Sequence, residues 1–373
     1  MRDAGCFALL VALLPLGGCG EPATAPGRTL DFSQPPGSPF PAGAQSNAVA
    51  IGDLDEDGVR DLVVANAQSD NLSLLLGNGD GTFQAARTLA AGDEPQFVSI
   101  ADLNADGHLD LAVANAEADG VEALLGDGHG AFQAQPASVT GRYPWALAAG
   151  DLNGDGIVDL AVATYFSGGS VLLGNGGGTF QAERVVAGGS GVSAVAIAPL
   201  NGDGIPDLVV LNALFDQFAV LLGKGDGTFD IQPLLDVGAQ PNDVATGDFD
   251  RDGVLDLAIV NGFSNDVAVL LGKGDGSFQP PARFGVGSDP RALALGDLDG
   301  DGLLDLAVAN LTSNTVSVLL GRGNGTFQTQ RTFAVGESPL GVAIGDLNGD
   351  GALDLAVANN HSNSVTVLLN RRR

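Results

Sequence analysis

Short apolar runs alternate with turn residues along most of the sequence. In a unit near the C-terminus, apolar runs occupy residues 341–347, 354–359 and 364–369, and complete units add a fourth run that begins with Phe-Gln. Runs of this length and composition, bounded by Gly, Asp and Asn, indicate strands and not helices. Runs such as residues 306–309 do not alternate with polar residues, which favours sheets that are packed on both faces.

The same unit recurs seven times with a nearly constant period. A loop of the pattern D-x-[DN]-x-D-G-x-x-D follows the first run of each unit, and the seven loops begin at Asp53, Asp102, Asp151, Pro199, Asp248, Asp297 and Asp346. The spacing is 49 residues, except for 48 between the third and fourth loops. A period of this kind is typical of a protein that repeats one supersecondary unit. Four strands in each of seven units predict an all-β fold, a seven-bladed β-propeller of four-stranded antiparallel blades.

The two ends of the repeat region complement each other. A linear solenoid would need a polar capping repeat at each end. Here the seventh unit stops at residues 368–370, where its fourth strand should begin, and residues 29–32 precede the first unit like an isolated fourth strand. Phe32 lies 21 residues before Asp53, close to the 19 residues from Phe83 to Asp102. We therefore expect one propeller over residues 29–370, closed by the N-terminal strand pairing into the last blade.

The first residues are typical of an export signal. Arg2 precedes an apolar stretch at residues 6–16 that is too short to span a bilayer, and residues 16–19, Leu-Gly-Gly-Cys, resemble a bacterial lipobox. This predicts a signal peptide at residues 1–18, lipidation of Cys19, a tether at residues 19–28 and, after the propeller, a basic tail at residues 371–373. The expected location is the bacterial cell envelope, on the outer membrane or surface; ordinary cleavage near Cys19 would instead give a secreted protein.

The charge of the chain is strongly negative. The formal net charge is −29 with 16 Lys and Arg residues, and both cysteines lie in the first 20 residues. Nucleic acid and anionic membranes are excluded as partners because both need clustered cations, so membrane contact would come only through a lipid anchor. A disordered chain is also excluded, since 45% of the residues are hydrophobic. We expect a monomer whose carboxylates are concentrated at specific sites.

The aspartate loops are the places where these carboxylates are concentrated, and their pattern predicts calcium binding. Calcium prefers six to eight hard oxygen ligands, and alternate carboxylates in a tight loop converge on one point while a glycine lets the chain turn. We expect side chains at positions 1, 3, 5 and 9 and the carbonyl at position 7 to bind about six calcium ions. The candidate ligands are Asp53, Asp55, Asp57, Val59, Asp61; Asp102, Asn104, Asp106, His108, Asp110; Asp151, Asn153, Asp155, Ile157, Asp159; Asp248, Asp250, Asp252, Val254, Asp256; Asp297, Asp299, Asp301, Leu303, Asp305; and Asp346, Asn348, Asp350, Ala352, Asp354.

The fourth loop departs from this pattern. Pro199 replaces its first aspartate and leaves Asn201, Asp203 and Asp207, so we expect a weak or empty site there. The seven loops hold 23 aspartates, about half of the 45 acidic residues, so calcium should be linked to folding by relieving their repulsion. Two other interpretations of the loops fit less well. Ordinary Asx-rich turns would not require carboxylates at four fixed positions. An EF-hand would need flanking helices and a glutamate at position 12, and the sequence has neither. Magnesium fits less well, because it resists a cage made only of protein ligands.

The repeat resembles a known family. Residues 345–359, Gly-Asp-Leu-Asn-Gly-Asp-Gly-x-x-Asp-Leu-Ala-Val-Ala-Asn, and the run Leu-Leu-Gly-x-Gly-x-Gly-Thr-Phe of the complete units, such as residues 319–327, are similar to FG-GAP-like (VCBS) repeats, which are related to those of integrin α-chain propellers. The resemblance covers residues 29–370. It implies a seven-bladed propeller with calcium between the first and second strands, and an extracellular adhesion, ligand-binding or lectin-like role. Because the repeat itself is not catalytic in that family, fold and calcium sites carry over better than any activity.

A partner is expected on the face opposite the aspartate loops, where the repeats differ most. Aromatic residues gather in the variable connections of the third to fifth units: Tyr143, Trp145, Tyr165, Phe166, Phe215 and Phe263. Such a group suits stacking on sugar rings or anchoring an envelope or extracellular protein. The alternative is that these rings fill the central channel or pack under their own loops.

Catalysis has little support in the sequence. The three histidines lie in different places: His108 in a calcium loop, His129 in a Gly-rich turn and His361 in a variable loop. No Ser/His/Asp set and no nucleophile motif can be assigned in the sequence. We therefore expect a binding or adhesion module and no enzyme. A calcium-stabilised scaffold of an envelope assembly remains the alternative, followed by a polysaccharide-active enzyme with Arg142, Arg291 and His361 as its scattered candidates.

Overall fold

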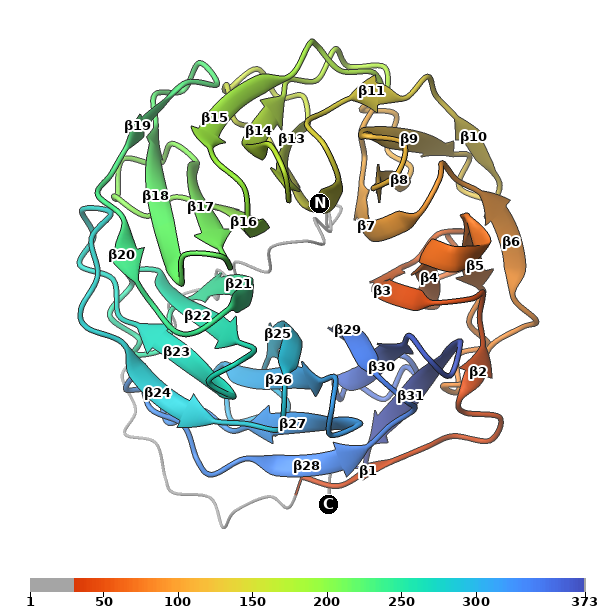
Figure 1. Cartoon of the computed structure of the whole chain (residues 1–373). Helices are drawn as coiled ribbons and strands as arrows, with labels where there is room; N and C mark the ends of the chain where they lie inside the picture. Colours follow the sequence, from red (N-terminus) through yellow and green to blue (C-terminus); the bar gives the residue numbers. More distant parts are fainter. Residues whose placement is uncertain (1–29, 372–373) are drawn as a thin grey trace.

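The computed structural model describes residues 30–371, which form seven antiparallel sheets arranged as blades around a central axis (Figure 1). In each blade the first strand lies innermost and the chain runs outward from it (Figure 1). The predicted seven-bladed β-propeller is therefore confirmed. The fold places the loop between the first and second strands at one end of every blade, and the connections that enter the first strand and leave the second at the other end.

The blades follow one another along the chain. Blade 1 comprises β3 (Ser46–Gly52), β4 (Asp61–Asn66), β5 (Asn71–Leu75) and β6 (Arg87–Ala90), with a 3-10 turn η1 (Ala67–Ser69) after β4; blade 2 comprises β7 (Pro95–Ala101), β8 (Asp110–Asn115), β9 (Gly120–Gly126), β10 (Phe132–Ala134) and β11 (Ser138–Val139); blade 3 comprises β12 (Pro144–Gly150), β13 (Asp159–Thr164), β14 (Gly168–Leu172) and β15 (Arg184–Gly188). Blade 4 comprises β16 (Val192–Ala198), β17 (Asp207–Asn212), β18 (Gln217–Gly223), β19 (Phe229–Ile231) and β20 (Leu235–Asp236); blade 5 comprises β21 (Pro241–Gly247), β22 (Asp256–Asn261), β23 (Asp266–Leu270) and β24 (Ala282–Gly285). Blade 6 comprises β25 (Pro290–Gly296), β26 (Asp305–Asn310), β27 (Thr315–Leu319) and β28 (Arg331–Ala334); blade 7 comprises β29 (Pro339–Gly345), β30 (Asp354–Asn359), β31 (Ser364–Asn370), β1 (Phe32–Ser33) and β2 (Phe40–Pro41). The outer strand is split in two in blades 2, 4 and 7.

The N-terminal segment closes the ring, as the sequence predicted. β1 and β2 both pair antiparallel with β31, with Phe32 opposite Asn370 and Phe40 opposite Val365. The two phenylalanines also contact the neighbouring blades: the ring of Phe32 lies 5.0 Å from that of Phe333, and the ring of Phe40 lies 5.2 Å from that of Phe83. The closing strands are therefore fixed by side-chain packing as well as by backbone pairing.

The hydrophobic core lies between adjacent blades. One buried cluster, for example, joins Ile51 and Leu62 of blade 1 to Ala356 and Val367 of blade 7, together with Phe40. The second strand of a blade is buried on both sides, which explains the uninterrupted apolar runs of the sequence; every residue from Asp354 to Asn359 is buried. Closing the ring leaves no blade with an uncovered face, because each sheet packs against two others.

Some expectations fall outside the described residues. The predicted signal peptide at residues 1–18, the lipidated Cys19, the tether at residues 19–28 and the end of the basic tail, residues 372–373, lie there. Within residues 30–371, no helix has both the length and the apolar character needed to cross a membrane.

Substituting Phe40 tests the closure. Phe40 is 8% exposed, and removing a buried phenylalanine side chain costs about 3 kcal/mol or more. Phe40→Ala should therefore lower the free energy of unfolding by that amount in urea denaturation. Phe263→Ala is the control, because Phe263 is 72% exposed and should change the value by less than about 0.5 kcal/mol. Equal effects of the two variants would contradict the role of Phe40 in closure.

Candidate metal loops and an aromatic pocket

The ninth position of each aspartate loop is a buried carboxylate that ties its blade together. One oxygen of Asp61 accepts a hydrogen bond from the N–H of Leu54 (2.8 Å), and the other accepts one from the N–H of Gly77 at the end of the third strand (2.8 Å). The same pair of bonds, at 2.7–3.0 Å, is made by Asp110, Asp159, Asp207, Asp256, Asp305 and Asp354. Asp207 makes them although its loop lacks the first aspartate. The ninth aspartate thus serves the fold in every blade, including the one that we expect to bind metal poorly.

The loop backbone also holds the first and fifth carboxylates. In the first loop, the N–H of Gly58 donates to Asp53 (3.1 Å) and the N–H of Val59 donates to Asp57 (2.8 Å). Gly58 has a φ of 87°, a conformation that glycine adopts without the steric cost of a side chain. The remaining Oδ1 atoms of Asp53 and Asp55 are buried and accept no hydrogen bond. Buried carboxylate oxygens without donors are suited to a cation, so the first loop fits a calcium ion.

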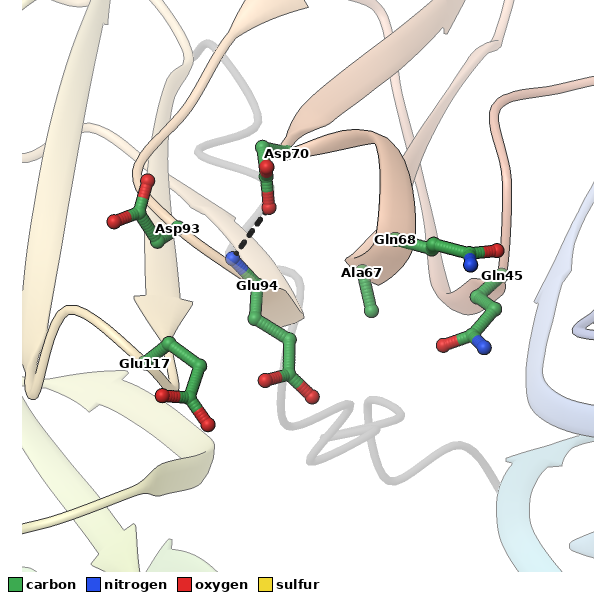
Figure 2. A pocket seen from close by; sticks show the side chains of 7 residues that line it. All are labelled: Gln45, Ala67, Gln68, Asp70, Asp93, Glu94 and Glu117. Carbon is green, nitrogen blue, oxygen red and sulfur yellow. Dashed lines mark hydrogen bonds between the residues drawn. The ribbon is translucent and has the colours of Figure 1, made fainter.

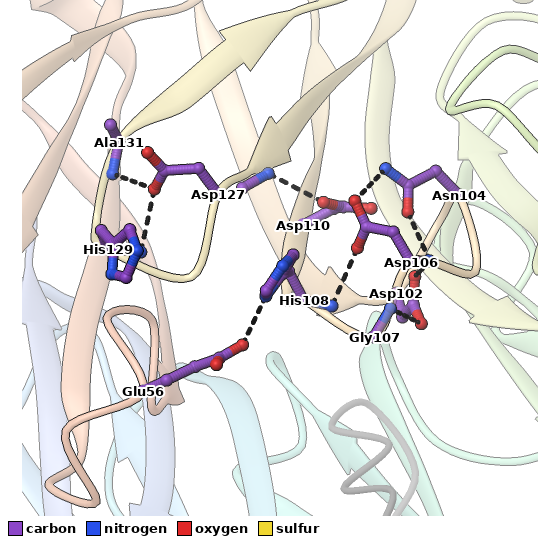
Figure 3. A network of polar contacts seen from close by, with 11 residues as sticks. Glu56, Asp102, Asn104, Asp106, Gly107, His108, Asp110, Asp127, His129 and Ala131 are labelled. Atoms are coloured by element: carbon purple, nitrogen blue, oxygen red, sulfur yellow. Dashed lines mark hydrogen bonds and ion pairs between the residues drawn. The ribbon is translucent and has the colours of Figure 1, made fainter.

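The loops fall into two classes by their third residue. In three loops that carry aspartate there, carboxylate oxygens lie within 4.8 Å of one another, and the groups are Asp53, Asp55, Asp57; Asp248, Asp250, Asp256; and Asp297, Asp299, Asp305. These clusters could hold metal ions. In the second and third loops the third residue is asparagine, and its amide donates to the fifth carboxylate, from Asn104 to Asp106 (2.8 Å; Figure 3) and from Asn153 to Asp155 (3.0 Å). The assignment of six calcium loops, with carbonyl ligands at position 7, stays a prediction.

The first two loops are joined through their side chains. Nδ1 of His108 lies 2.5 Å from a carboxylate oxygen of Glu56 (Figure 3). The hydrogen bond to Glu56 raises the pKa of the His108 imidazole above its usual value. The sequence indicated only a carbonyl ligand at His108, so this contact between blades was missed.

Burial changes the acidity of the ninth aspartates. Desolvation raises the pKa of Asp61 and Asp110 to about 6, and that of Asp256, Asp305 and Asp354 to about 7. The hydrogen bonds from backbone N–H groups lower the pKa of the same carboxyls, but desolvation has the larger effect. Neighbouring carboxylates of the same loop raise these values further. In the metal-free protein, ionising these loops therefore works against folding.

A pocket of about 1000 Å³ opens at the opposite end of the blades. Its walls come from blades 2 to 6, from the connections that leave the second strand, the connections that enter the first strand and the beginning of the first strand itself. The lining includes Glu117, Asp119, Arg142, Tyr143, Trp145, Tyr165, Phe166, Leu214, Asp216, Phe263 and Arg291. Five of the six aromatic residues predicted to bind a ligand thus line one cavity. Phe215, the sixth, is 65% exposed beside Leu214 but does not line the pocket. A pocket of this size and aromatic character is typical of a ligand site.

The aromatic rings of the pocket contact one another. The rings of Tyr143 and Trp145 are stacked with centroids 6.1 Å apart, and Phe166 meets Tyr143 and Tyr165 edge to face at 5.9 and 5.1 Å. The hydroxyl of Tyr143 donates to Glu94 (2.8 Å). Burial and this bond raise the pKa of Tyr143, which therefore stays protonated. Trp145 itself is half-buried.

The backbone around the pocket is held by a recurrent contact between blades. At six joints, an Asp or Asn after the second strand accepts a hydrogen bond of 2.7–2.9 Å from the N–H of a residue with positive φ in the next blade; the pairs are Asp70 and Glu94, Asp119 and Tyr143, Asp216 and Gln240, Asn265 and Asp289, Asn314 and Ser338, and Asn363 and Gln45. At the joint between blades 3 and 4, Gly168 takes the place of the Asp or Asn. The pocket lies over this exception. The 49-residue spacing of these residues was the signal that could have revealed them.

The raised pKa values give a pH dependence in the absence of calcium. Between pH 4 and 7 the folded, metal-free protein binds more protons than the unfolded chain, so its free energy of unfolding should fall as the pH rises through this range. One pKa unit corresponds to about 1.4 kcal/mol per group, and the total should reach several kcal/mol. Urea denaturation in chelator at pH 4, 5.5 and 7 measures it. Stability that rises with pH in chelator would contradict the assignment.

Comparisons with known proteins agree with this architecture. No curated protein matches the sequence. Among solved structures, BBS1N in complex with ARL6DN has a TM-score of 0.63 at 14% identity and covers 90% of this chain and 95% of that chain. A lectin from Agrocybe aegerita, whose structure concerns recognition of non-reducing terminal N-acetylglucosamine, has a TM-score of 0.55 at 20% identity and covers 85% and 86%. A catalytically inactive virginiamycin B lyase from Staphylococcus aureus with quinupristin has a TM-score of 0.58 at 12% identity and covers 92% and 99%. At these identities the likeness shows the fold alone.

The family is shown by the repeats themselves. The FG-GAP-like repeat matches residues 53–113, 102–162, 151–210, 200–259, 252–308 and 297–357. Each match contains one whole acidic loop, all or part of a neighbouring loop, and the strands between them. The resemblance noted in the sequence is confirmed, and the chain belongs to the FG-GAP-like repeat family.

Proposed function

We propose that this protein is an exported, calcium-binding propeller of the bacterial cell envelope that binds a glycan or an envelope protein in its aromatic pocket. The FG-GAP-like repeat propeller suggests a binding or scaffold module. The observation that carries the proposal is the gathering of Tyr143, Trp145, Tyr165, Phe166 and Phe263 around one cavity of about 1000 Å³. Aromatic side chains offer large contact areas at low entropic cost, and their polar tips can orient a ligand.

The division of the molecule into two ends supports the proposal. Calcium would bind at one end, where seven buried aspartates already tie each loop to its blade, and the ligand would bind at the other end. We propose that calcium stabilises the ring and keeps the pocket walls in place. The residues that would hold it in the best-formed loops are Asp53, Asp55 and Asp57; Asp248, Asp250 and Asp256; and Asp297, Asp299 and Asp305.

We propose no catalytic role for the pocket. His108 contacts Glu56 in the acidic loops, and His361 contacts Ser338, so neither histidine lines the pocket. Arg291 forms an ion pair with Asp289 (2.9 Å). Of the three scattered candidates, Arg142 and Arg291 line the pocket and His361 does not.

Calorimetric titration of the metal-free chain tests the calcium sites. We expect about six bound calcium ions, at dissociation constants on the order of 10⁻⁴ to 10⁻³ M as in extracellular modules, and a higher melting temperature in calcium than in chelator. Asp248→Asn should remove one site. Pro199→Asp restores the missing first ligand of the fourth loop and should add one. An unchanged melting temperature together with no heat of binding would rule out calcium.

Trp145→Ala tests the pocket. Because buried aromatic anchors dominate many interfaces, the variant should lose at least about tenfold in affinity for the glycan or envelope protein that the wild type captures on arrays. Phe215→Ala is the matched control, since Phe215 lies on the same face outside the pocket lining, and it should bind as the wild type does. If Trp145→Ala keeps its melting temperature and also keeps every interaction of the wild type, the scaffold role replaces the binding role.

A further inference from the structure

The charges around the aromatic pocket indicate the kind of ligand that it takes. The pocket walls carry the carboxylates of Glu117, Asp119 and Asp216 beside the aromatic rings. Two arginines, Arg142 and Arg291, share the lining, and Arg291 is paired with Asp289. The net charge of the side chains that line the pocket is therefore negative, like the net charge of −29 of the whole chain. A negatively charged lining favours a positively charged ligand.

A second, smaller cavity extends this negative region. It has a volume of about 360 Å³ and is lined by the carboxylates of Asp70, Asp93, Glu94 and Glu117 (Figure 2). Glu117 lines both cavities. Tyr143 joins them too, because its ring lies in the aromatic pocket while its hydroxyl donates to Glu94. A ligand that lies against the rings can thus place a cationic group beside Glu117.

The pocket already holds a cation against one of its rings. The guanidinium carbon of Arg142 lies over the ring of Phe166, 5.6 Å from its centroid. Attraction between a cation and an aromatic face is strongest where water is partly excluded. The rings of Trp145, Tyr165 and Phe263 offer further aromatic faces for a cation on a ligand.

The backbone of the walls favours a sugar over a peptide. Peptides that bind by strand addition need free main-chain donors and acceptors. Here the N–H groups of the wall residues are donated within the protein: Tyr143 to Asp119, Tyr165 to Tyr143, Phe166 to Arg142, Leu214 to Asn212, Gln240 to Asp216 and Phe263 to Ala239. The groups that remain for contact with a ligand are the aromatic faces and the carboxylates. An aromatic face suits the apolar face of an amino sugar, and a carboxylate suits its ammonium group.

We propose that the pocket binds an oligosaccharide of amino sugars whose amines are free and protonated. The inference rests on the proposed ligand-binding role of the pocket and adds the charge of the ligand. Aromatic faces stack on the pyranose rings, and Glu117 pairs with an ammonium group at the junction of the two cavities. A volume of about 1000 Å³ is at the upper end of the range for ligand pockets, so it accommodates more than a monosaccharide.

Calorimetric titration of the calcium-loaded full chain tests this proposal with four probes: a glucosamine trimer, its N-acetylated trimer, trigalacturonic acid and trilysine. The glucosamine trimer should bind at least about tenfold more tightly than the N-acetylated trimer, and its affinity should fall as salt is raised, because screening weakens exposed charge pairs. Trigalacturonic acid and trilysine should bind more weakly than either.

Three variants make the test specific. Glu117→Gln should weaken binding of the glucosamine trimer by about threefold to tenfold and leave the N-acetylated trimer unchanged. Glu337→Gln is the matched control, since Glu337 is an exposed acid in the connection that enters blade 7 and does not line the pocket. Arg142→Met removes the resident cation from Phe166 and should strengthen binding of the glucosamine trimer.

The outcomes separate this inference from the function on which it rests. Equal affinity for the two trimers, lost in Trp145→Ala, would overturn the charge preference and keep the carbohydrate site. Tighter binding of trilysine would replace the sugar by a basic peptide, and tighter binding of trigalacturonic acid would reverse the sign of the charge. If no probe binds, both the inference and the carbohydrate role fail.

Discussion

A buried carboxylate with two backbone partners is the interaction on which each blade depends. A charged group taken out of water is costly unless hydrogen bonds replace its hydration, and Asp61 and its six equivalents each receive N–H groups from the loop behind the first strand and from the end of the third strand. In blade 7 the second donor is Asn370. The acidic end of every blade is therefore fixed by the same contact, and the loops that carry the remaining carboxylates are built on it.

The opposite end of the ring is held by a different contact, which joins neighbouring blades. At six of the seven boundaries between blades, an Asp or Asn side chain of one blade accepts a hydrogen bond from the backbone of the next blade. At the boundary between blades 3 and 4, Gly168 stands in place of the Asp or Asn. Tyr143 occupies a left-handed position that carries Gln, Glu, Asp or Ser at the other linked joints. A bulky residue in this conformation is uncommon, and here its ring forms part of the pocket wall. The scaffold thus keeps the acidic end of the blades nearly constant, while the residues at the other end differ from blade to blade.

The sequence was sufficient for the features that are local and repeated. The 49-residue period, the strand-length apolar runs and the isolated strand around Phe32 predicted seven blades and their closure, because each of these signals can be read directly from the order of residues in the chain. Contacts that join different blades were not predictable in the same way. The bond from Tyr143 to Glu94 spans 49 residues, and the pocket takes Leu214 and not Phe215 because the turn between β17 and β18 decides which side chain faces inward. The structural role of Asp207 was also hidden, since the motif alone assigns that aspartate to metal.

The pairing of β1 and β2 with β31 gives assembly of the ring an order in time. Blades 1 to 6 form from strands that follow one another in the chain, so each can pair as soon as its own segment is available. Blade 7 cannot, because Ser38 and Val367, which are hydrogen-bonded to each other, stand 329 residues apart. Closing a loop of this length costs only about 0.6 kcal/mol more free energy than closing one half as long. The separation therefore limits the order in which the strands pair more than the free energy of their pairing. The N-terminal strands β1 and β2 therefore wait for β31 before the ring can close, and a chain cut short anywhere before β31 remains an open arc with two bare sheets at its ends.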